Sequence, residues 1–375
     1  MDALEEAILK SGSAAYVAFG SSQDADMRYL TRFSTTDPIV YIKKPGEQGT
    51  VVVSQMEYER ARRESTASVM TRSEAGLFEI QEEEKDRWRA LARMIAGLVH
   101  GGVLVSPHFP YALAKELSTL VEVRIDRAAL VTMRGRKSEW EIGMIRQVQV
   151  AVDEAMQTGI TMIRKAGIRG GLLSRGAVPL TSGMVRAAMH QILLRRGCTP
   201  ADTIVACGEE TAFPHIRGEG ALRADEPIVI DIFPRDDQTG YYSDMSRTVC
   251  RGEPAPEIRE MFWAVSEAQD LAEARILPGV TGEEVYRAVV DFFSELGYGT
   301  GNSGFVHNLG HGVGLEVHEA PSLGPSGEVL VQGNVVTNEP GLYLPGTGGV
   351  RLENIGVIEE GGFITMTRFP RELVP

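Results

Sequence analysis

The first third of the chain alternates between short apolar runs and longer amphipathic stretches. The apolar runs are continuous over a few residues, as expected for strands that are covered on both faces. They span residues 14–20, 38–44, 51–55, 103–106 and 121–125. Stretches with helical spacing lie between them, at Asp2 to Lys10, Met56 to Arg63, Lys85 to Val99 and Pro110 to Leu120. This alternation predicts an α/β unit in which helices pack on a mixed sheet.

Longer helical patterns and a strand-rich end characterise the rest of the chain. Ser138 and Glu141 have the spacing of a capping box and begin a helix that is predicted to reach about Gly159. A glycine-rich piece, residues 167–171, follows, and from Phe305 onward the pattern is strand and loop. Further helices are predicted at Thr181 to Gly197, Glu257 to Ala274 and Thr281 to Leu296, and strands at 204–208 and 227–233. We therefore predict two domains, residues 1–133 and residues 134–375, in a protein of the α+β class.

The composition limits the kinds of molecule that the protein can bind and the compartment in which it is expected. The net charge of -13 argues against nucleic-acid binding, which needs a basic face. The apolar runs are short and interrupted by charges, so we expect no membrane span, and the N-terminal segment lacks the order of a signal peptide. Three cysteines, Cys198, Cys207 and Cys250, show neither a disulfide framework nor zinc spacing. These features favour the reducing cytoplasm.

Two aspartates flank a predicted β-hairpin. Asp231 ends an apolar strand, and Asp244 stands 13 residues later, after a turn at Thr239-Gly240. This layout places the two carboxylates opposite each other on neighbouring strands. Carboxylates this close repel each other unless one is protonated or a cation neutralises them. Asp236 and Asp237 lie in the turn itself and are expected to be solvated.

Two glutamates stand out nearer the C-terminus. Glu339 follows the apolar residues 335–337 and precedes the turn signal Pro340-Gly341. Glu353 alternates with Arg351 on a predicted strand, so both side chains should point to the same face. In an apolar context, such a pair is expected to be buried together or to line a cleft.

Three of the seven histidines, His307, His311 and His318, fall between residues 305 and 321. Glycines surround His311, so the backbone there can approach a ligand closely, although an exposed turn would look the same in isolation. Together with the four acids, His311 completes a set of hard oxygens and one imidazole, which suits Mn, Fe, Co or Zn. Five ligands with four negative charges exceed the needs of one dication, so we predict two adjacent ions that share a water. The other lone histidines, His100, His108 and His190, are expected to be structural or exposed.

The acidic and histidine motifs occur in the order IDIFP…GYYSDMSRT, GHGVGLEVHE, TNEPGLY and VRLEN. In this combination the chain resembles the pita-bread-fold metallopeptidase family, which includes Xaa-Pro dipeptidases, aminopeptidase P, methionine aminopeptidase and creatinase. Residues from about 134 to 375 resemble its catalytic domain, with a curved antiparallel sheet. Residues 1 to 130 resemble the creatinase-type N-terminal domain, and DMRYLTRF at 26–33 is similar to a recurring segment of that domain.

The resemblance implies which residues would hold the metals. Asp231 would chelate one ion, Asp244 and Glu353 would bridge both, and His311 and Glu339 would hold the other. Two divalent ions are implied, with manganese favoured and cobalt, zinc and iron tolerated.

The resemblance also implies catalytic roles. Glu339 would accept the proton of the attacking water, and His318 would contact the scissile carbonyl. His307 and His215 would contact the substrate, and Arg351 would support the bridging glutamate.

The expected activity is hydrolysis of the Xaa-Pro bond in dipeptides, in an enzyme that is a homodimer. Aminopeptidase P shares these motifs and is the alternative; only the compact two-domain length favours a dipeptidase. A non-catalytic binding protein on the same fold would generally have lost ligands, and all five stand here. One departure from the family concerns the hairpin, which is two residues longer and has Phe233-Pro234 where glycine is usual; we expect a longer turn that leaves the ligands in place.

Overall fold

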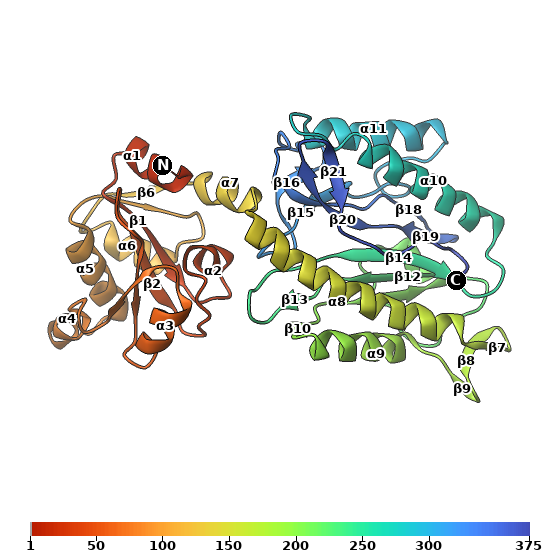
Figure 1. Ribbon diagram of the computed structural model, residues 1–375, viewed down its shortest axis with the longest axis horizontal. Coiled ribbons are helices and arrows are strands. Elements are labelled where there is room, and N and C mark those ends of the chain that lie inside the picture. The colour runs from red at the N-terminus through yellow and green to blue at the C-terminus, as the bar shows by residue number, and fades with distance from the viewer. Residues whose placement is uncertain (1) are drawn as a thin grey trace. The chain divides into compact units, whose positions relative to one another are not determined.

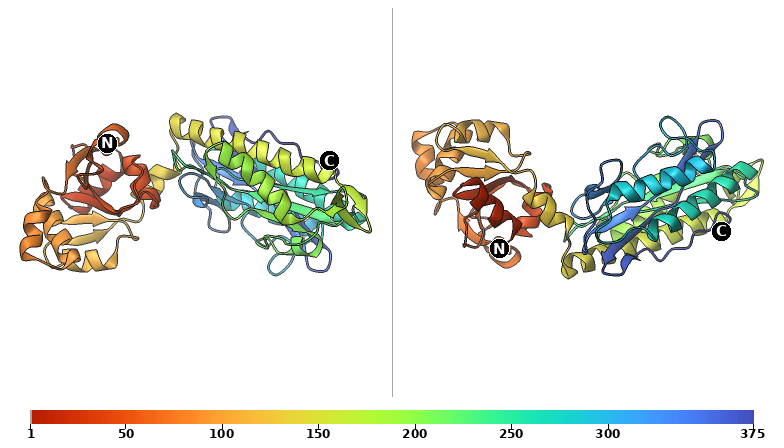
Figure 2. Two further views of the ribbon diagram at one scale, coloured as in Figure 1. Left: turned by 90° about the horizontal axis from the view of Figure 1, so that it is seen from below. Right: turned by 90° about the horizontal axis from the view of Figure 1, so that it is seen from above.

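The structure, a computed structural model, describes residues 2–375. Its internal contacts divide the chain into two compact units, one ending at Arg134 and one beginning at Gly135 (Figure 1, Figure 2). Among the described residues, no helix is both long enough and apolar enough to cross a bilayer. Cys198, Cys207 and Cys250 are free and buried, as predicted.

The N-terminal unit contains a six-stranded mixed sheet of order β4-β3-β2-β1-β5-β6, in which β1 runs antiparallel to β2 and parallel to β5. Tyr16 and Val17 are successive residues of β1 and belong to different apolar clusters, so both faces of the sheet are covered. The strands are β1 (Ala15–Gly20), β2 (Ile39–Lys43), β3 (Thr50–Val53), β4 (Ser68–Thr71), β5 (Val103–Val105) and β6 (Val123–Ile125). The helices are α1 (Ala3–Ser11), α2 (Ala25–Thr31), α3 (Tyr58–Glu64), α4 (Leu77–Glu83), α5 (Arg87–Val99), α6 (Tyr111–Leu117) and α7 (Ala129–Gly135). The predicted mixed α/β unit is confirmed, although the short elements α2, α4, α7 and β4 were not predicted.

Two of the antiparallel sheets in the C-terminal unit are each packed against their own pair of helices. The first half joins α8 (Glu139–Arg164) and α9 (Ser182–Arg195) to the sheet β11-β12-β14 in one apolar cluster. The second half joins α10 (Pro256–Glu273) and α11 (Gly282–Glu295) to the sheet β16-β15-β17-β20-β21. In Figure 1, α8 and α9 lie on one side of the strands and α10 and α11 on the other. The strands therefore form a layer between two helix pairs.

The larger sheets of this unit consist of β11 (Ile204–Cys207), β12 (Pro227–Ile232), β14 (Met245–Cys250), β15 (Gly310–Gly312), β16 (Glu319–Leu323), β17 (Val335–Asn338), β20 (Asn354–Glu359) and β21 (Gly362–Thr365). The smaller ones are formed by β7 (Gly167–Arg169), β8 (Leu172–Arg175) and β9 (Val178–Pro179), by β10 (Cys198–Thr199) and β13 (Arg235–Asp236), and by β18 (Gly341–Leu344) and β19 (Gly348–Arg351). A 3-10 helix, η1, spans Gly208–Ala212.

Helix α8 differs from the prediction at its C-terminal end. It continues to Arg164 instead of ending near Gly159. Gly159 lies within the helix, where an added Cβ would stand 2.7 Å from the sulfur of Met189 on α9. The glycine therefore permits close packing of two helices and does not end one. The glycine-rich piece that follows it contributes to the small sheet β7-β8-β9.

Candidate metal centre

The two aspartates of the first acidic motif lie on one face of the sheet β11-β12-β14. Strands β12 and β14 are antiparallel, with Asp231 opposite Ser246. Asp244 stands two residues before Ser246, so both carboxylates point to the same side. The predicted hairpin pairing is confirmed. Its extra length is not a free turn, however, because β13 in the loop pairs with β10.

His311 and Glu339 meet at the adjoining strands β15 and β17. His311 Nε2 lies 3.2 Å from Glu339 Oε1 and 3.9 Å from Asp244 Oδ2. His311 Nδ1 lies 3.1 Å from the carbonyl oxygen of Gly312, which can only accept, so Nδ1 carries the proton and Nε2 faces the carboxylates. The Thr337 hydroxyl accepts from the His311 backbone N–H at 3.1 Å and donates to Glu339 Oε1 at 3.3 Å. This arrangement leaves Nε2 directed to the place that a metal ion would occupy.

Glu353 is brought to the same place by the connection between β19 and β20. Its backbone N–H donates to the Ser246 carbonyl at 3.0 Å, which joins the two halves of the unit behind the site. One ligand atom each from Asp244, His311 and Glu353 lies within 4.8 Å of the others. The structure thus brings the five predicted ligands together from five separate strands or strand ends.

The electrostatics of this cluster fit a cation. Burial, followed by the charge of Glu353, raises the pKa of Asp244 well above its ordinary value. Burial, followed by the charges of Glu339 and Asp231, does the same to the pKa of Glu353. Asp231 Oδ1 and Asp244 Oδ1 are buried, and neither has a hydrogen-bond partner. Buried carboxylate oxygens without donors are costly unless a cation neutralises them, so the donor set suits divalent metal ions.

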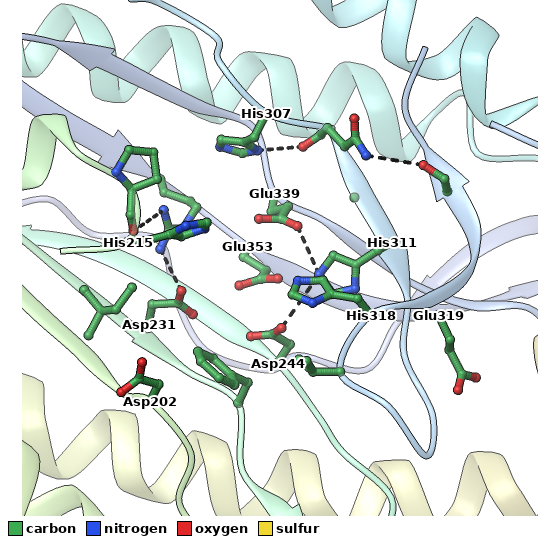
Figure 3. Close-up of a pocket in the computed structure, with 18 of the residues that line it drawn as sticks. Asp202, His215, Asp231, Asp244, His307, His311, His318, Glu319, Glu339 and Glu353 are labelled. Carbon is green, nitrogen blue, oxygen red and sulfur yellow. Dashed lines mark hydrogen bonds and ion pairs between the residues drawn. The ribbon is translucent and has the colours of Figure 1, made fainter. Parts of the chain in front are cut away.

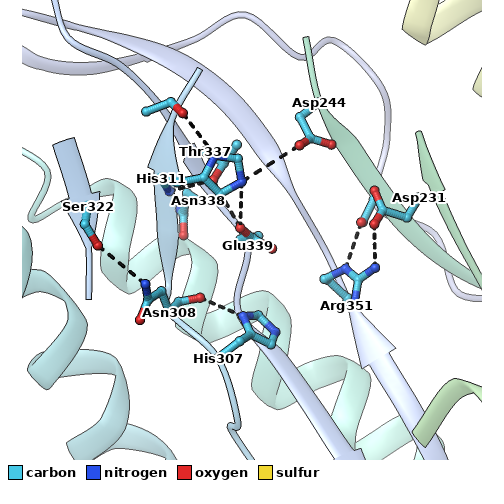
Figure 4. Close-up of polar contacts among 12 residues, drawn as sticks. Asp231, Asp244, His307, Asn308, His311, Ser322, Thr337, Asn338, Glu339 and Arg351 are labelled. Atoms are coloured by element: carbon cyan, nitrogen blue, oxygen red, sulfur yellow. Dashed lines mark hydrogen bonds and ion pairs between the residues drawn. The ribbon is translucent and has the colours of Figure 1, made fainter. Parts of the chain in front are cut away.

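Arg351 has a different partner from the expected one. Its Nη2 donates to Asp231 Oδ2 at 2.7 Å (Figure 4). Its Nη1 donates to the Tyr343 hydroxyl at 2.9 Å, and its Nε to the Ser246 hydroxyl at 2.9 Å. Among the described residues, no hydrogen bond joins Arg351 to Glu353. Arg351 therefore orients the terminal aspartate of the cluster directly.

His307 uses both of its ring nitrogens within the protein. Nδ1 lies 2.6 Å from the carbonyl oxygen of Asn308 and Nε2 lies 2.8 Å from the Tyr343 hydroxyl. Because a carbonyl can only accept, Nδ1 carries the proton of the neutral ring, and Nε2 accepts from the tyrosine. Burial lowers the pKa of His307, which agrees with a neutral ring.

A cavity of about 870 Å³ opens above the carboxylates (Figure 3). All nine residues of the predicted site line it, including His318, whose ring packs against that of His311 with centroids 4.2 Å apart, and the exposed His215. The cavity wall also contains residues that the sequence analysis did not assign to the site: Asp202, Ile204, Phe233, Asn308, Glu319 and Glu328. Ile204 could have been found from strand pairing, because it stands opposite Asp231 in the sheet.

With this geometry established, the comparisons place the chain in a family. Residues 143–360 match metallopeptidase family M24, and residues 2–136 match the creatinase/prolidase N-terminal domain. The chain belongs to metallopeptidase family M24. The predicted resemblance and fold class are confirmed, and the chain is that of a metal-dependent peptidase.

Similar proteins agree in length as well as in sequence. An Xaa-Pro dipeptidase of Pyrococcus horikoshii is 32% identical over 341 residues, which cover 89% of this chain and 88% of that protein. The crystal structure of the prolidase from Pyrococcus horikoshii matches with a TM-score of 0.83 at 28% identity, covering 99% of this chain and 98% of that one. An X-Pro aminopeptidase structure from Thermotoga maritima matches with a TM-score of 0.81 at 26% identity, covering 97% and 98%.

Proposed function

We propose that the chain is an Xaa-Pro dipeptidase that works with two divalent metal ions. The observation that carries the proposal is the convergence of four carboxylates and one imidazole at the floor of a single cavity. The similarity to Xaa-Pro dipeptidases over nearly the whole chain supports the choice of substrate. An Xaa-Pro bond is a tertiary amide whose ring obstructs general peptidases, so a dedicated site is needed.

Of the five proposed ligands, two would be shared by both metal ions and the other three would each bind one ion. Asp244 and Glu353 are central and would contact both ions, with Asp231 at one end and His311 and Glu339 at the other. When bound, the ions would polarise the peptide carbonyl and activate a water molecule for attack. We propose manganese as the resident metal, and the same donors tolerate cobalt, zinc and iron.

Glu339 and His318 supply the proton chemistry. Glu339 lines the cavity, with Oε1 3.2 Å from His311 Nε2, so its carboxylate would be placed to accept the proton of the attacking water. Glu339 then passes this proton to the proline nitrogen as the peptide bond breaks. Burial, followed by the charge of His311, lowers the pKa of His318, so its neutral ring donates a hydrogen bond to the carbonyl oxygen as negative charge develops there.

His307 and His215 act on the substrate in different ways. Both His307 nitrogens are already occupied, so its ring offers van der Waals contact to the proline ring. His215 is exposed at the cavity wall and is free to hydrogen-bond to the substrate carboxylate. Together, the two histidines would bind the proline residue of the substrate.

Hydrolysis of Ala-Pro and of Ala-Pro-Pro by the purified chain tests the proposal. Each peptide is measured with manganese, after chelation and after manganese is restored. We expect efficient, chelator-sensitive cleavage of Ala-Pro. Preferred cleavage of the tripeptide would reassign the chain to the Xaa-Pro aminopeptidases, and cleavage of neither peptide by metal-loaded protein would refute the substrate class.

A matched pair of variants connects the activity to the carboxylate cluster. Asp244→Asn should abolish bound metal and turnover while the circular dichroism spectrum is retained. Asp237 belongs to the same hairpin, but its carboxylate contacts Thr199 and does not line the cavity. Asp237→Asn should therefore leave metal content and turnover unchanged. Equal metal content in the two variants would exclude Asp244 as a ligand.

We further propose a cytoplasmic homodimer. Three free, buried cysteines support a reducing compartment, because burial raises the pKa of each thiol and none is paired. Analytical ultracentrifugation of the full chain tests the dimer, which a sedimentation mass of one chain, 40.9 kDa, would exclude.

A further inference from the structure

A buried ion pair stands beside the metal centre and takes no part in the chemistry described above. Lys137 Nζ lies 2.6 Å from Glu319 Oε1, and the two side chains are only 1% and 6% exposed. The partners are 182 residues apart in the sequence. Glu319 also lies in the cavity wall, directly after His318 (Figure 3).

Lys137 is attached to a rigid part of the unit. Its backbone N–H donates to the Gly333 carbonyl at 2.8 Å, just before β17, the strand that directly precedes Glu339. The next residue, Ser138, is the N-cap of α8 and forms a complete capping box with Glu141. The ammonium group therefore projects from a fixed point.

Glu319 holds the segment that carries His318. Residues 313–318 connect β15 to β16 without helix or strand geometry. The Glu316 backbone N–H points to Glu319 Oε2 at 3.4 Å. Gly314 leaves room for the carboxylate, since an added Cβ there would stand 2.2 Å from Glu319 Oε1. The loop is thus folded around this carboxylate, and the carboxylate is held by Lys137.

We propose that Lys137 and Glu319 are positioning residues for the catalytic step. They fix the loop of residues 313–318, and hence the direction of the His318 ring, relative to the metal ligands. This proposal rests on the proposed peptidase function, in which His318 contacts the reacting carbonyl. Neither residue touches the reacting atoms.

An ion pair suits this task better than an apolar contact would. Replacing a buried pair by apolar side chains of similar volume often leaves stability unchanged or raises it, whereas removing one partner leaves an uncompensated charge. Stability alone therefore gives little reason for the pair. A charge-assisted hydrogen bond does fix a direction, which an apolar contact does not.

The test uses a variant that removes both charges together. Lys137→Met/Glu319→Leu removes both charges of this pair at once, so the protein should fold and bind metal as the wild type does. We expect its kcat for Ala-Pro to fall about 100-fold, the order of loss for a catalytic group misplaced by about 1 Å, with little change in KM. A double variant with normal metal content and near-normal kcat would overturn the proposal.

A second background shows whether the ion pair acts through His318. His318→Ala is itself impaired, and adding the double substitution to it should lower kcat no further. If the double substitution lowered kcat in the His318→Ala background by the same factor as in the wild type, the ion pair would act on a group other than His318. If the double variant does not fold, Glu319→Gln replaces it, because glutamine keeps the shape of the side chain. This variant should also lower kcat with little change in KM. An unchanged kcat would count against the proposal.

Two controls separate positioning from general stability and from the proposed substrate. Arg134→Met removes a partly buried ion pair, with Asp26 at 2.9 Å, from the N-terminal unit, so it should lower the unfolding midpoint without changing kcat. Carbon-13 spectra of labelled histidine in zinc-loaded protein report the His318 ring without any substrate, because zinc is diamagnetic and does not broaden the signal. We expect the His318 signal to move in the double variant even if Ala-Pro proves not to be the substrate, and an unmoved signal would refute the positioning role.

Discussion

Arg351 and Asp231 form an ion pair of 2.7 Å in which the side chains are only 4% and 13% exposed. The guanidinium donates a hydrogen bond to one oxygen of the aspartate, Oδ2, while Oδ1 is buried and has no hydrogen-bond partner. The same guanidinium donates to the hydroxyl groups of Tyr343 and Ser246. Arg351 thus fixes the carboxylate so that its remaining oxygen is available to a metal ion.

Removal of this guanidinium should weaken metal binding. Outer groups that orient a ligand typically contribute about 10–100-fold in metal affinity, so Arg351→Met should lower manganese affinity by about that factor. Competition with a metal-binding dye measures it. The control Arg287→Met breaks an exposed pair with Glu283 and should leave the affinity unchanged. Wild-type affinity in Arg351→Met would show that Asp231 needs no such support.

The convergence of the five candidate ligands could be predicted from the sequence, but the partner of Arg351 could not. The ligand motifs are local, and their order along the chain indicated which carboxylates converge. The prediction for Arg351 assumed one continuous strand through Glu353, whereas β19 ends at Arg351 and β20 begins at Asn354. The break frees the arginine to pair across the sheet with Asp231. Pairing between distant strands leaves no signal in either local pattern.

Two further differences have the same origin in tertiary packing. Gly159 has the local signature of a helix end, and only the approach of Met189 shows why a glycine lies inside α8. Lys137 carries no local signal of burial, because its burial depends on Glu319, far along the chain. By contrast, elements with strong local signals, such as the capping box at Ser138 and Glu141, formed where they were predicted.

The metal-free protein should lose stability as the pH rises. The pKa values of Asp244 and Glu353 are raised in the folded state, chiefly by burial. The stability that these two carboxyl groups contribute is therefore fully present below their pKa in the unfolded chain, about 4. It is lost as the pH rises through their raised pKa values in the folded protein. Glu339 acts in the opposite sense, because its contribution is lost only as the pH falls toward about 2.

Urea midpoints measured between about pH 5 and pH 8 on chelated protein test this sign. We expect the midpoint to fall as the pH rises, and saturating manganese to remove most of the slope because the ion replaces the protons. A chelated protein that gains stability across this interval would show that the carboxylates do not share a buried site.

Phe233 should influence which residue is accepted before proline. It lies two residues beyond Asp231, just past the end of β12, and lines the cavity together with Ile204. Phe233→Gly removes apolar contact area, so kcat/KM for Leu-Pro should fall relative to Gly-Pro by about 10-fold. Phe213→Ala, at an exposed phenylalanine outside the cavity wall, should leave this ratio unchanged. A uniform loss on both dipeptides would assign Phe233 a structural role instead.

Gln269 on α10 supports both glutamate ligands from behind. Its side-chain amide donates to the carbonyls of Asn338 at 2.9 Å and Leu352 at 3.0 Å, the residues directly before Glu339 and Glu353. Gln269 is fully buried. Gln269→Leu has a similar volume and removes both donors, and each buried carbonyl left unpaired costs about 1–3 kcal/mol.

The unfolding free energy of Gln269→Leu should therefore fall by about 2–6 kcal/mol, as measured by urea titration with saturating manganese. Manganese affinity should fall as well, since the backbone that carries two ligands is no longer held. Gln157→Leu removes an exposed glutamine contact on α8 and should change neither quantity. If Gln269→Leu lowers stability but binds manganese normally, the positions of Glu339 and Glu353 are set by their strands alone, and α10 contributes only to packing.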